Sequence, residues 1–324
     1  MINNKNVLVT GGAGFIGSNL CESLLQNNNN VTCLDNFITG NKKNISSHLE
    51  NPNFKLIEGD IRDLKDCEAA VNGNEIVLHQ AALGSVPRSI ADPSTTNEIN
   101  INGFLNMLIA TQNEGIKRFV YAASSSTYGD SKELPKIEDN IGMPLSPYAV
   151  TKYVNELYAH VFSNLHGLET IGLRYFNVFG RKQDPNGAYA AAIPKFIKAF
   201  MNHEPPKING DGSQTRDFTY IDNVIQANLL AGSTKNKEAL NKVYNIACGD
   251  QSILIELVEK LRTLLSSFDP KIKDVKINHG PERVGDVKYS LASIEKAKTL
   301  IQYNPTHDVN KGLEEAIQWY WENL

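Results

Sequence analysis

The chain has 324 residues, of which 41% are hydrophobic and 21% charged, and its formal net charge at pH 7 is −4. This composition is typical of a globular protein with one large domain or two modest ones. The negative balance excludes a global basic field, so neither nucleic acid nor an anionic membrane is expected as a partner. The sequence contains no run of about 18 apolar residues, so no membrane span is expected.

The four cysteines are scattered along the chain, at Cys21, Cys33, Cys67 and Cys248. They form no C-x-x-C motif, and no histidine cluster has metal-ligand spacing, so no metal site is expected. The chain runs almost at once into a strand and a glycine-rich loop, which predicts no signal peptide. Reduced thiols and a cytoplasmic location are the expectation.

Residues 1–178 alternate apolar strand-like runs with helical patterns, which predicts a parallel sheet built from βαβ units. Strands are expected at 6–10, 30–35, 54–59, 76–80, 119–123 and 170–175, and helices at 15–26, 97–114 and 147–166. Most of these strands are continuous apolar runs, as in a sheet with helices on both faces. The expected fold is α/β, a Rossmann doubly wound parallel sheet that forms the cofactor-binding domain.

After about residue 180 the pattern changes to fewer strands and more loops. A turn at 185–187 precedes an expected helix at 188–202, and a short strand is expected near 243–247. Helices are expected at 253–265, 291–300 and 310–322. The sequence therefore predicts a smaller C-terminal α/β substrate domain, residues 179–324, that closes over the strand ends, with segments that can cross back.

Gly11, Gly14 and Gly17 follow the first expected strand in a G-x-x-G-x-x-G arrangement that opens a helix. Such glycines permit a tight turn and let backbone amides approach a pyrophosphate, although a glycine turn without a ligand has the same local pattern. Asp35 ends the second strand, where a carboxylate can accept hydrogen bonds from both adenosine ribose hydroxyls and repels a 2′-phosphate. The pattern favours NAD over NADP.

Two further strand ends extend this site. Asp60 and Ile61, at the end of the third strand, can reach the adenine, although Asp60 can equally be a loop-capping residue. Gln80, Ala81 and Ala82, at the end of the fourth strand, leave small residues where a cofactor can pass.

Tyr148 and Lys152 are the most informative pair in the chain. Ser146 and Pro147 predict an N-cap and a first helical residue, so the pair lies one turn apart on one helix face. A free tyrosine ionises near pH 10, and a neighbouring cation lowers that pKa. The spacing alone is also typical of a solvated helix face. Behind a dinucleotide loop it indicates a proton-transfer pair.

Ser124, Ser125 and Ser126 end the fifth strand, the edge where open α/β sheets bind ligands. Serines are also common in loops. Their combination with Tyr148 and Lys152 favours catalysis.

The loop TGGAGFIGSNL, Asp35, Ser124, the Tyr148/Lys152 pair and LRYFNVFG resemble the extended short-chain dehydrogenase/reductase family over essentially the whole chain. The segments HQAALGSVPRS, YAASSSTYGD, LSPYAVTKYVNELYA and RYFNVFGRKQDPNGAYAA resemble its nucleotide-sugar 4-epimerases acting on UDP-N-acetylhexosamines. This resemblance implies that Tyr148 removes the proton of the sugar 4-hydroxyl while hydride leaves C4 for NAD⁺. Lys152 would hold the nicotinamide ribose and lower the tyrosine pKa, and Ser124 would hydrogen-bond the 4-oxygen. The 4-keto sugar would then turn over and take the hydride back on its other face.

The resemblance also implies two sets of binding residues. The cofactor set is Gly11, Gly14, Phe15, Ile16, Gly17, Asp35, Asn36, Asp60, Ile61, Gln80, Ala81, Ala82, Tyr148, Lys152, Tyr175 and Val178. The substrate set is Gly84, Ser85, Arg88, Ser124, Ser125, Ser126, Tyr148, Asn177, Ala191, Ala192, Lys195, Ile208, Asn209, Arg216, Arg283, Asp286 and Ser290. Within it, Asn177 and the cations Lys195, Arg216 and Arg283 would face the diphosphate.

Three positions narrow the reaction and the substrate by resemblance. The 4,6-dehydratases carry an Asp-Glu pair where this chain has Ser125-Ser126-Thr127, which argues against elimination. Ser290 matches a size gate at which a tyrosine restricts the pocket to glucose and galactose, so serine leaves space for a 2-acetamido group. Gly84-Ser85 stands where plain UDP-galactose epimerases carry Leu-Lys. UDP-GlcNAc/UDP-GalNAc interconversion is the resulting prediction.

Alternatives remain open at this point. The same scaffold is compatible with a 4-epimerase for uronates, in which Arg88 would pair with the sugar carboxylate, or for plain hexoses. It is also compatible with a reductase and with an oxidative decarboxylase. A non-catalytic NAD-binding protein is the third possibility, because fold alone does not determine function. The helices at 97–114 and 147–166 can pair across a two-fold axis, and a homodimer is expected by resemblance.

Overall fold

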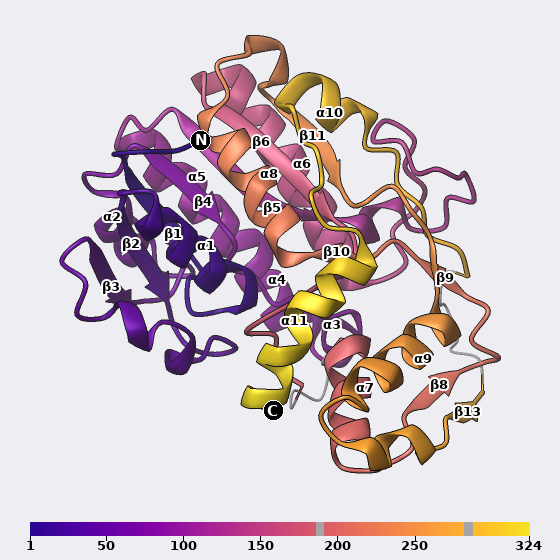
Figure 1. Cartoon of the computed structure of the whole chain (residues 1–324). Helices are drawn as coiled ribbons and strands as arrows, with labels where there is room; N and C mark the ends of the chain where they lie inside the picture. Colours follow the sequence, from indigo (N-terminus) through magenta and orange to yellow (C-terminus); the bar gives the residue numbers. More distant parts are fainter. Residues whose placement is uncertain (186–190, 282–287) are drawn as a thin grey trace.

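The computed structural model describes residues 1–185, 191–281 and 288–324. Its centre is a fully parallel seven-stranded sheet in the order β11-β6-β5-β4-β1-β2-β3 (Figure 1). The strands of this sheet are β1 (Asn6–Thr10), β2 (Asn30–Asp35), β3 (Phe54–Glu58), β4 (Ile76–His79), β5 (Arg118–Ser124), β6 (Glu169–Tyr175) and β11 (Lys242–Ile246). The prediction of a Rossmann doubly wound fold is confirmed.

The strand order places a topological switch point in the middle of the sheet. The chain begins at β1, moves outward through β2 to β3, and then crosses back to place β4 on the other side of β1. In open α/β sheets ligands bind beside the carboxyl ends of the strands at such a point. The loops after β1 and β4 are therefore the first place to look for a site.

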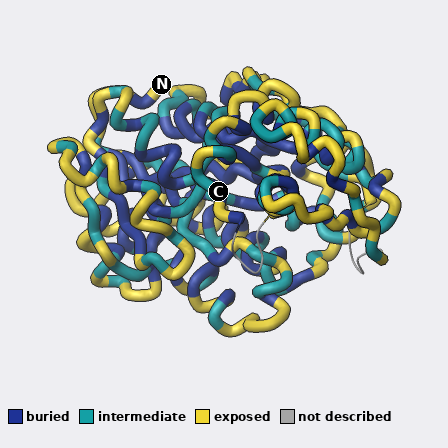
Figure 2. The backbone as a smooth tube through the Cα atoms, turned by 60° about the horizontal axis from the view of Figure 1, so that its bottom comes forward, coloured by how far each residue is buried: buried dark blue, intermediate teal, exposed yellow. Residues whose placement is uncertain are grey.

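Helices cover both faces of the sheet. The helices are α1 (Phe15–Gln26), α2 (Leu64–Val71), α3 (Val86–Ala91), α4 (Pro93–Asn97), α5 (Gly103–Asn113), α6 (Pro147–His166), α7 (Ala192–Met201), α8 (Ile221–Ser233), α9 (Leu254–Leu265), α10 (Glu295–Ile301) and α11 (Val309–Asn323). Val7 and Val9 of β1 belong to one buried cluster and Leu8 to another, because alternate strand residues point to opposite faces. The first cluster includes residues of α1 and α8, the second residues of α2 and α5. Figure 2 shows this buried interior beneath an exposed outer layer.

The second half of the chain contributes both to the sheet and to a separate lobe. The strand expected near 243–247 was assigned to a smaller domain, but β11 pairs with β6 at the edge of the main sheet. The lobe contains α7, α9, β8 (Lys207–Asn209) and β13 (Asn278–Gly280), at the lower right of Figure 1. Short pairs complete the fold: β7 (Val178–Phe179) with β10 (Thr219–Tyr220), and β9 (Thr215–Arg216) with β12 (Ser252–Ile253). The division into 1–178 and 179–324 stays a prediction.

Several expected helices differ from the observed ones. The helix expected at 97–114 is three pieces, since α4 begins at Pro93 behind an Asp92 cap and a π-helical stretch, Glu98–Asn102, leads into α5. The helix expected at 291–300 begins only at Glu295. The start of the helix expected at 188–202 falls partly outside the described residues, and α7 begins at Ala192. Among the described residues no helix is both long and apolar enough to cross a bilayer.

Candidate active site

The glycine loop after β1 packs too closely for side chains. Gly11 has φ +66°, and a Cβ there would lie 2.8 Å from the backbone of Ala81. A Cβ on Gly17 would lie 2.1 Å from the Gly11 carbonyl oxygen. Gly14 is the N-cap of α1, and among the described residues no side chain caps that helix start. The loop thus presents backbone at a helix N-terminus, which suits an anion.

A cavity of about 370 Å³, the glycine-loop cavity, opens beside this loop. Eleven of the sixteen predicted cofactor residues line it: Gly11, Gly14, Phe15, Ile16, Gly17, Asp35, Asn36, Ile61, Gln80, Ala81 and Ala82. The sequence did not single out the other lining residues, which come from these strand ends and from more distant segments: Leu34, Ile38, Thr39, Gly40, Gly59, Leu83, Ile99 and Asp184. Gly84 and Arg88, predicted to face the sugar, line the same cavity.

Asp35 lies buried at the end of β2 with its carboxylate held by backbone amides. Its Oδ2 accepts a hydrogen bond from Ala13 N and its Oδ1 one from Phe37 N, both at 2.8 Å. Burial raises the pKa of Asp35, and the two amides oppose that rise. Each carboxylate oxygen keeps a second lone pair, so the carboxylate can still accept hydrogen bonds from two ribose hydroxyls.

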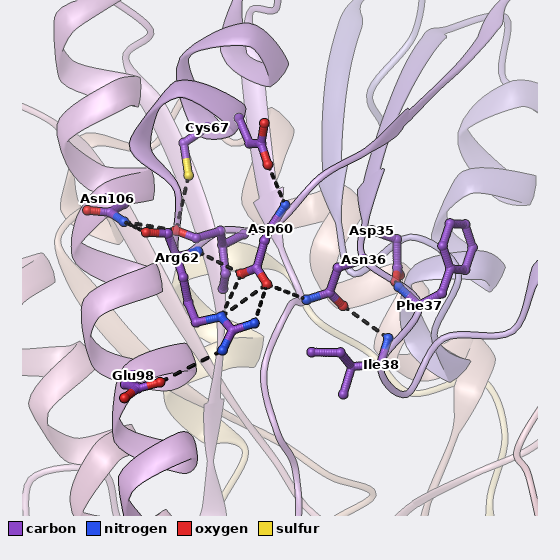
Figure 3. A network of polar contacts seen from close by, with 11 residues as sticks. Asp35, Asn36, Phe37, Ile38, Asp60, Arg62, Cys67, Glu98 and Asn106 are labelled. Atoms are coloured by element: carbon purple, nitrogen blue, oxygen red, sulfur yellow. Dashed lines mark hydrogen bonds and ion pairs between the residues drawn. The ribbon is translucent and has the colours of Figure 1, made fainter.

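Asp60 does not line the cavity, and its carboxylate has protein partners (Figure 3). Its Oδ2 accepts from Asn36 Nδ2 at 2.9 Å and from Arg62 Nε at 3.0 Å, while Oδ1 accepts the Arg62 amide at 2.8 Å. Burial acts to raise the pKa of Asp60, but the Arg62 guanidinium lowers it to about 2. Of the two residues expected here, Ile61 faces the cavity and Asp60 fixes the loop.

The end of β4 joins the cavity to β6. Tyr175 OH donates to Gln80 Oε1 at 3.1 Å and accepts from Asn228 Nδ2 at 2.9 Å. Gln80 lines the glycine-loop cavity, whereas Tyr175 does not. Tyr175 therefore supports the cavity wall through Gln80.

Ser124 and Tyr148 meet at the carboxyl end of β5. Helix α6 begins behind Ser146, whose Oγ accepts Ala149 N at 3.2 Å, as the sequence predicted. Tyr148 N donates to Ser89 Oγ of α3 at 3.0 Å. Ser126 Oγ donates to Ser124 Oγ at 2.9 Å. Burial raises the pKa of Tyr148, and a hydrogen bond with the Ser124 side chain opposes that rise.

Lys152 lies buried one turn further along α6. Its ammonium donates to the Ala122 carbonyl at 2.8 Å, on the strand that ends in Ser124. Burial lowers the pKa of Lys152 to about 8, against the opposing charge of Glu156. Lys152 was expected to lower the pKa of Tyr148. In this structure the pKa of Tyr148 is raised overall, and the Lys152 ammonium donates to a backbone carbonyl, so the two residues by themselves do not produce that effect.

A second cavity of about 590 Å³, the Asn177 cavity, lies between the end of β6 and the lobe. Seven predicted residues line it: Asn177, Val178, Ala191, Ala192, Lys195, Asn209 and Arg216. Val178 was expected beside the cofactor but lies here. Ile208 is fully buried and does not line this cavity. Asn177 holds the loop before β10, since its Nδ2 donates to Asp217 O at 3.0 Å.

The remaining predicted substrate residues are less directly placed. Ser85 is the N-cap of α3 and accepts Arg88 N at 3.2 Å, so its side chain has a structural partner. Ser290 is partly buried, just before Leu291, whose carbonyl accepts Lys136 N at 2.7 Å. Neither cavity is lined by Ser290. Arg283 and Asp286 lie outside the described residues.

Asp217 is a buried residue that the sequence analysis did not single out. Its carboxylate accepts Cys248 N at 2.9 Å, Gly249 N at 3.1 Å and Ala292 N at 3.2 Å. Burial raises its pKa to about 7, and the amides oppose this. It joins the Arg216 loop to the segment that carries Ser290. No local signal separates it from a surface aspartate, because its partners are distant in sequence.

The fold also brings together a group that the spacing did not predict. Oxygen and nitrogen atoms of Asp222, His307 and Glu315 lie within 4.8 Å of one another. His307 Nε2 is 3.0 Å from Glu315 Oε1, and the Arg181 guanidinium lies 2.7 Å from Asp222 Oδ1. Because this guanidinium already provides a cation, we assign no metal to the group.

The fold and this site correspond to one known class. The family model described as the NAD dependent epimerase/dehydratase family matches residues 7–247. The chain belongs to this family of enzymes and is of the short-chain dehydrogenase/reductase type.

Solved structures of high similarity extend over the whole chain. The UDP-N-acetylglucosamine 4-epimerase of Methanobrevibacter ruminantium, in complex with UDP-N-acetylmuramic acid, is 38% identical, with 100% of both chains covered and a TM-score of 0.91. The UDP-glucose 4-epimerase of Thermotoga maritima, with UDP-glucose, is 33% identical over 98% of this chain and 99% of its own, with a TM-score of 0.89. The UDP-glucuronic acid 4-epimerase of Bacillus cereus, with UDP-glucuronic acid and NAD, is 34% identical over 98% and 100%, with a TM-score of 0.88.

NAD is the cofactor of this family, and the glycine-loop cavity fits it. A Cβ at Gly11 or Gly17 would fill the turn where a pyrophosphate approaches, and the Asp35 carboxylate suits ribose hydroxyls. Nucleotide-sugar 4-epimerisation is the activity that the comparisons support, while their named sugars differ.

Proposed function

We propose that the protein interconverts UDP-GlcNAc and UDP-GalNAc through a transient 4-keto sugar. The observation that carries this proposal is the juxtaposition of Ser124, Tyr148 and Lys152 at the carboxyl edge of the sheet. That edge lies beside the glycine-loop cavity in a chain of the NAD dependent epimerase/dehydratase family.

In this mechanism Tyr148 is the base that takes the proton of the sugar 4-hydroxyl and later returns it. Ser124, already hydrogen-bonded to Tyr148, holds the 4-oxygen. Lys152, whose ammonium donates to the Ala122 carbonyl, orients the cofactor ribose. Bound NAD would supply the hydride acceptor and donor for C4 of the sugar, and the positive charge of its oxidised form would favour the Tyr148 phenolate.

The Asn177 cavity is the proposed site of the UDP group. Its lining combines the amides of Asn177 and Asn209 with three cations, Lys195, Lys207 and Arg216. A diphosphate carries about two negative charges and suits such fixed cationic partners. We retain Arg283 and Asp286 as proposed contributors from their sequence context, GPERVGDV.

The choice of an N-acetylated sugar rests on Ser290 and on the neighbour from Methanobrevibacter ruminantium. A serine side chain leaves space that a tyrosine would fill. The neighbour named UDP-N-acetylglucosamine 4-epimerase shares 38% identity over the full chain. A uronate substrate is the second candidate because Arg88 lines the cavity beside Gly84 and can pair with a carboxylate.

We also propose a cytoplasmic homodimer. Val150, Leu157, Val161 and Leu165 of α6 are 46%, 49%, 45% and 72% exposed, although all are large and apolar. Their spacing of seven, four and four places them along one side of the helix. A second copy of the same helix would cover such a stripe.

The testing experiment is proton NMR of UDP-GlcNAc incubated with the purified protein and no added NAD. Growth of UDP-GalNAc signals to a constant ratio supports 4-epimerisation, bound cofactor and N-acetyl tolerance together. Without change, NAD is added and UDP-Glc and UDP-GlcNAcA are tried in turn. If only UDP-Glc or only UDP-GlcNAcA is converted, that sugar is the substrate. If no UDP-sugar is converted, the epimerase proposal is contradicted. Absorbance near 340 nm, from tightly held NADH, tests the internal redox cycle separately.

A further inference from the structure

A buried ion pair joins strand β6 to helix α6, the helix that carries Tyr148 and Lys152. Arg174 of β6 donates from Nε to Glu156 Oε1 at 2.8 Å and from Nη2 to Glu156 Oε2 at 2.7 Å. Their side chains are only 4% and 7% exposed. A pair buried this deeply pays a desolvation cost that its attraction barely offsets, so stability alone does not explain it. Its surroundings point to a positioning role.

The Arg174 guanidinium contacts more than one element of the site. It lies over the ring of Tyr128 at 4.8 Å and donates from Nη1 to the Glu138 carbonyl at 2.8 Å. Tyr128 ends the 3₁₀ turn Ser125–Tyr128, which begins directly after Ser124. The ring is anchored in turn, because Tyr128 OH donates to Asn245 Oδ1 at 2.6 Å. Arg174 therefore touches the turn that directly follows Ser124.

Glu156 connects the same guanidinium to α6. It follows Lys152 by four residues and Tyr148 by eight, so all three lie along one side of the helix. Its negative charge opposes the burial that lowers the pKa of Lys152. One ion pair thus touches both elements that must meet for proton transfer.

We propose that the Arg174–Glu156 pair is the positioning device of the active site, which holds helix α6 in register with the turn after Ser124. The pair lines neither the glycine-loop cavity nor the Asn177 cavity, and it acts through Tyr128 on one side and through α6 on the other. A second consequence is electrostatic, since Glu156 keeps positive charge on Lys152. This inference deepens the proposed function and rests on it for the identity of the reacting residues.

The other charged groups near the pair come from several elements. Glu138, Asp139, Lys242 and Lys296 line a cavity of about 360 Å³ next to it, together with His160 of α6. Glu138 Oε1 accepts Asn245 N at 2.9 Å and Lys296 Nζ lies 3.5 Å from Asp139. The charge of Glu156 acts on Tyr121 of β5, and the charge of Lys152 acts on His79 of the neighbouring strand β4. Among these charges, Glu156 is the one that opposes the burial-driven lowering of the pKa of Lys152.

The test uses the double variant Glu156→Gln/Arg174→Met, which removes both charges and leaves neither uncompensated. The matched control is Arg118→Met/Glu169→Gln. The two side chains of that pair lie 2.7 Å apart and join the first residues of β5 and β6, at the end of these strands opposite to Ser124 and Arg174. Thermal melting of all variants reports their stability, and turnover is measured with the UDP-sugar that the wild type converts.

The expected result is a fall in kcat of about tenfold or more with KM little changed, since only positioned contacts of the transition state are lost. The control should keep wild-type kcat even if it melts earlier. Arg174→Lys keeps the charge but not the bidentate fork, and should give an intermediate kcat. Equal kcat in the wild type and in a folded double variant would overturn the proposal, as would an equal loss in the control.

A second readout does not need a substrate. Lysine labelled with ¹³C at Cε gives NMR signals that follow protonation, and the signal missing from Lys152→Arg belongs to Lys152. In the double variant its titration should move to lower pH by about 0.5 unit or more, while the control and Arg174→Lys keep the wild-type midpoint. An unmoved midpoint contradicts the electrostatic part of the inference. If the wild type converts no UDP-sugar, the proposed function fails but this titration still tests the pair.

Discussion

At the residue scale, Asp35 and Asp60 end neighbouring strands but have different surroundings. The Asp35 carboxylate faces the glycine-loop cavity and, within the described part of the chain, accepts hydrogen bonds only from backbone amides, whereas Asp60 pairs with Arg62. We predict that Asp35→Asn weakens NAD binding about 10- to 100-fold, because hydrogen bonds to a charged acceptor contribute about 1.5–3 kcal/mol. Asp60→Asn should change affinity less than about twofold. Calorimetric titration of NAD into cofactor-stripped protein measures both.

The Asp60 variant is the matched control for the Asp35 variant, and both should melt somewhat earlier than the wild type. If Asp60→Asn lost as much NAD affinity as Asp35→Asn, the alternative reading of Asp60 as an adenine contact would be restored.

Ser290 provides the second prediction at this scale. The family resemblance, and not the lining of either cavity, places a size gate at Ser290. From it we predict that Ser290→Tyr reduces turnover of UDP-GlcNAc at least about tenfold, since overfilling the sugar site costs about 1–3 kcal/mol. Turnover of UDP-Glc should be retained. The same change at Ser267, an exposed residue after α9, is the control and should leave both rates unchanged. The measurement is the rate of conversion of UDP-GlcNAc and of UDP-Glc, followed by a coupled assay or by NMR. Undiminished turnover of UDP-GlcNAc by Ser290→Tyr would refute the size gate.

At the element scale, the contact between Gly17 of α1 and the Gly11 carbonyl controls how the helix meets its loop. A Cβ would lie 2.1 Å from that oxygen, which belongs to rigid backbone, so the helix start must shift. We predict that Gly17→Ala loses bound NAD and destabilises the fold by about 1–3 kcal/mol. Cofactor content by absorbance, with urea unfolding, measures the two effects.

Gly115→Ala separates backbone strain from this steric effect. Gly115 has φ +78° and nothing within 4 Å of an added Cβ, so its cost is conformational, about 1–2 kcal/mol. It should retain NAD. Loss of NAD in both variants would mean that general destabilisation, and not the loop geometry, releases the cofactor.

The elements that the sequence predicted best have strong local signals. The bounds 15–26 and 147–166 agree with α1 and α6, and α6 has a serine cap, a proline at its first position and Gly167 at φ +68° after its end. Helix α8 was missed because its buried face includes Asn223 and Asn228. Asn223 donates to the distant His307 carbonyl, and Asn228 donates to the distant Tyr175 OH as well as to Val224 O of its own helix.

The same distinction applies to the site. The glycine loop and the Tyr148/Lys152 pair are contiguous motifs, so their positions on the helices follow from local sequence. Asp217 binds backbone amides at 248, 249 and 292, and the guanidinium of Arg174 is shared among three separate segments. No periodicity or spacing encodes such long-range contacts. The roles of the predicted site residues stay predictions that the variants above test.

At the scale of the whole molecule, the buried His79 links folding to pH. It lies at the end of β4 with Nδ1 2.8 Å from Thr10 Oγ1. Burial, with a smaller contribution from Lys152, lowers its pKa to about 3. An unfolded histidine takes up a proton near pH 6.5, so between about pH 6.5 and 3 the unfolded chain binds more protons and stability falls as pH falls.

This linkage predicts that His79 contributes about 2 kcal/mol to the loss of unfolding free energy between pH 7 and 5. In His79→Asn, which keeps a polar atom near Thr10, that loss should be smaller by about this amount. The exposed His160→Asn is the control and should behave as the wild type. Urea unfolding at both pH values measures the difference, and an identical pH dependence in His79→Asn would contradict the assignment.

The exposed apolar stripe of α6 has a consequence for assembly. Leu157, 49% exposed, lies at its centre, on the same helix as Tyr148 and Lys152. We predict that Leu157→Glu converts a dimer into a monomer, because a buried carboxylate without a partner costs more than the apolar contact gains. Leu49→Glu, at a site similarly exposed (47%) but away from α6, is the control and should stay dimeric. Analytical ultracentrifugation at several concentrations decides between them. Because α6 carries the proton-transfer pair, a monomeric variant with full kcat would show that each protomer's site is complete, whereas a loss of kcat on dissociation would mean that the partner's helix helps to hold Tyr148 and Lys152 in place.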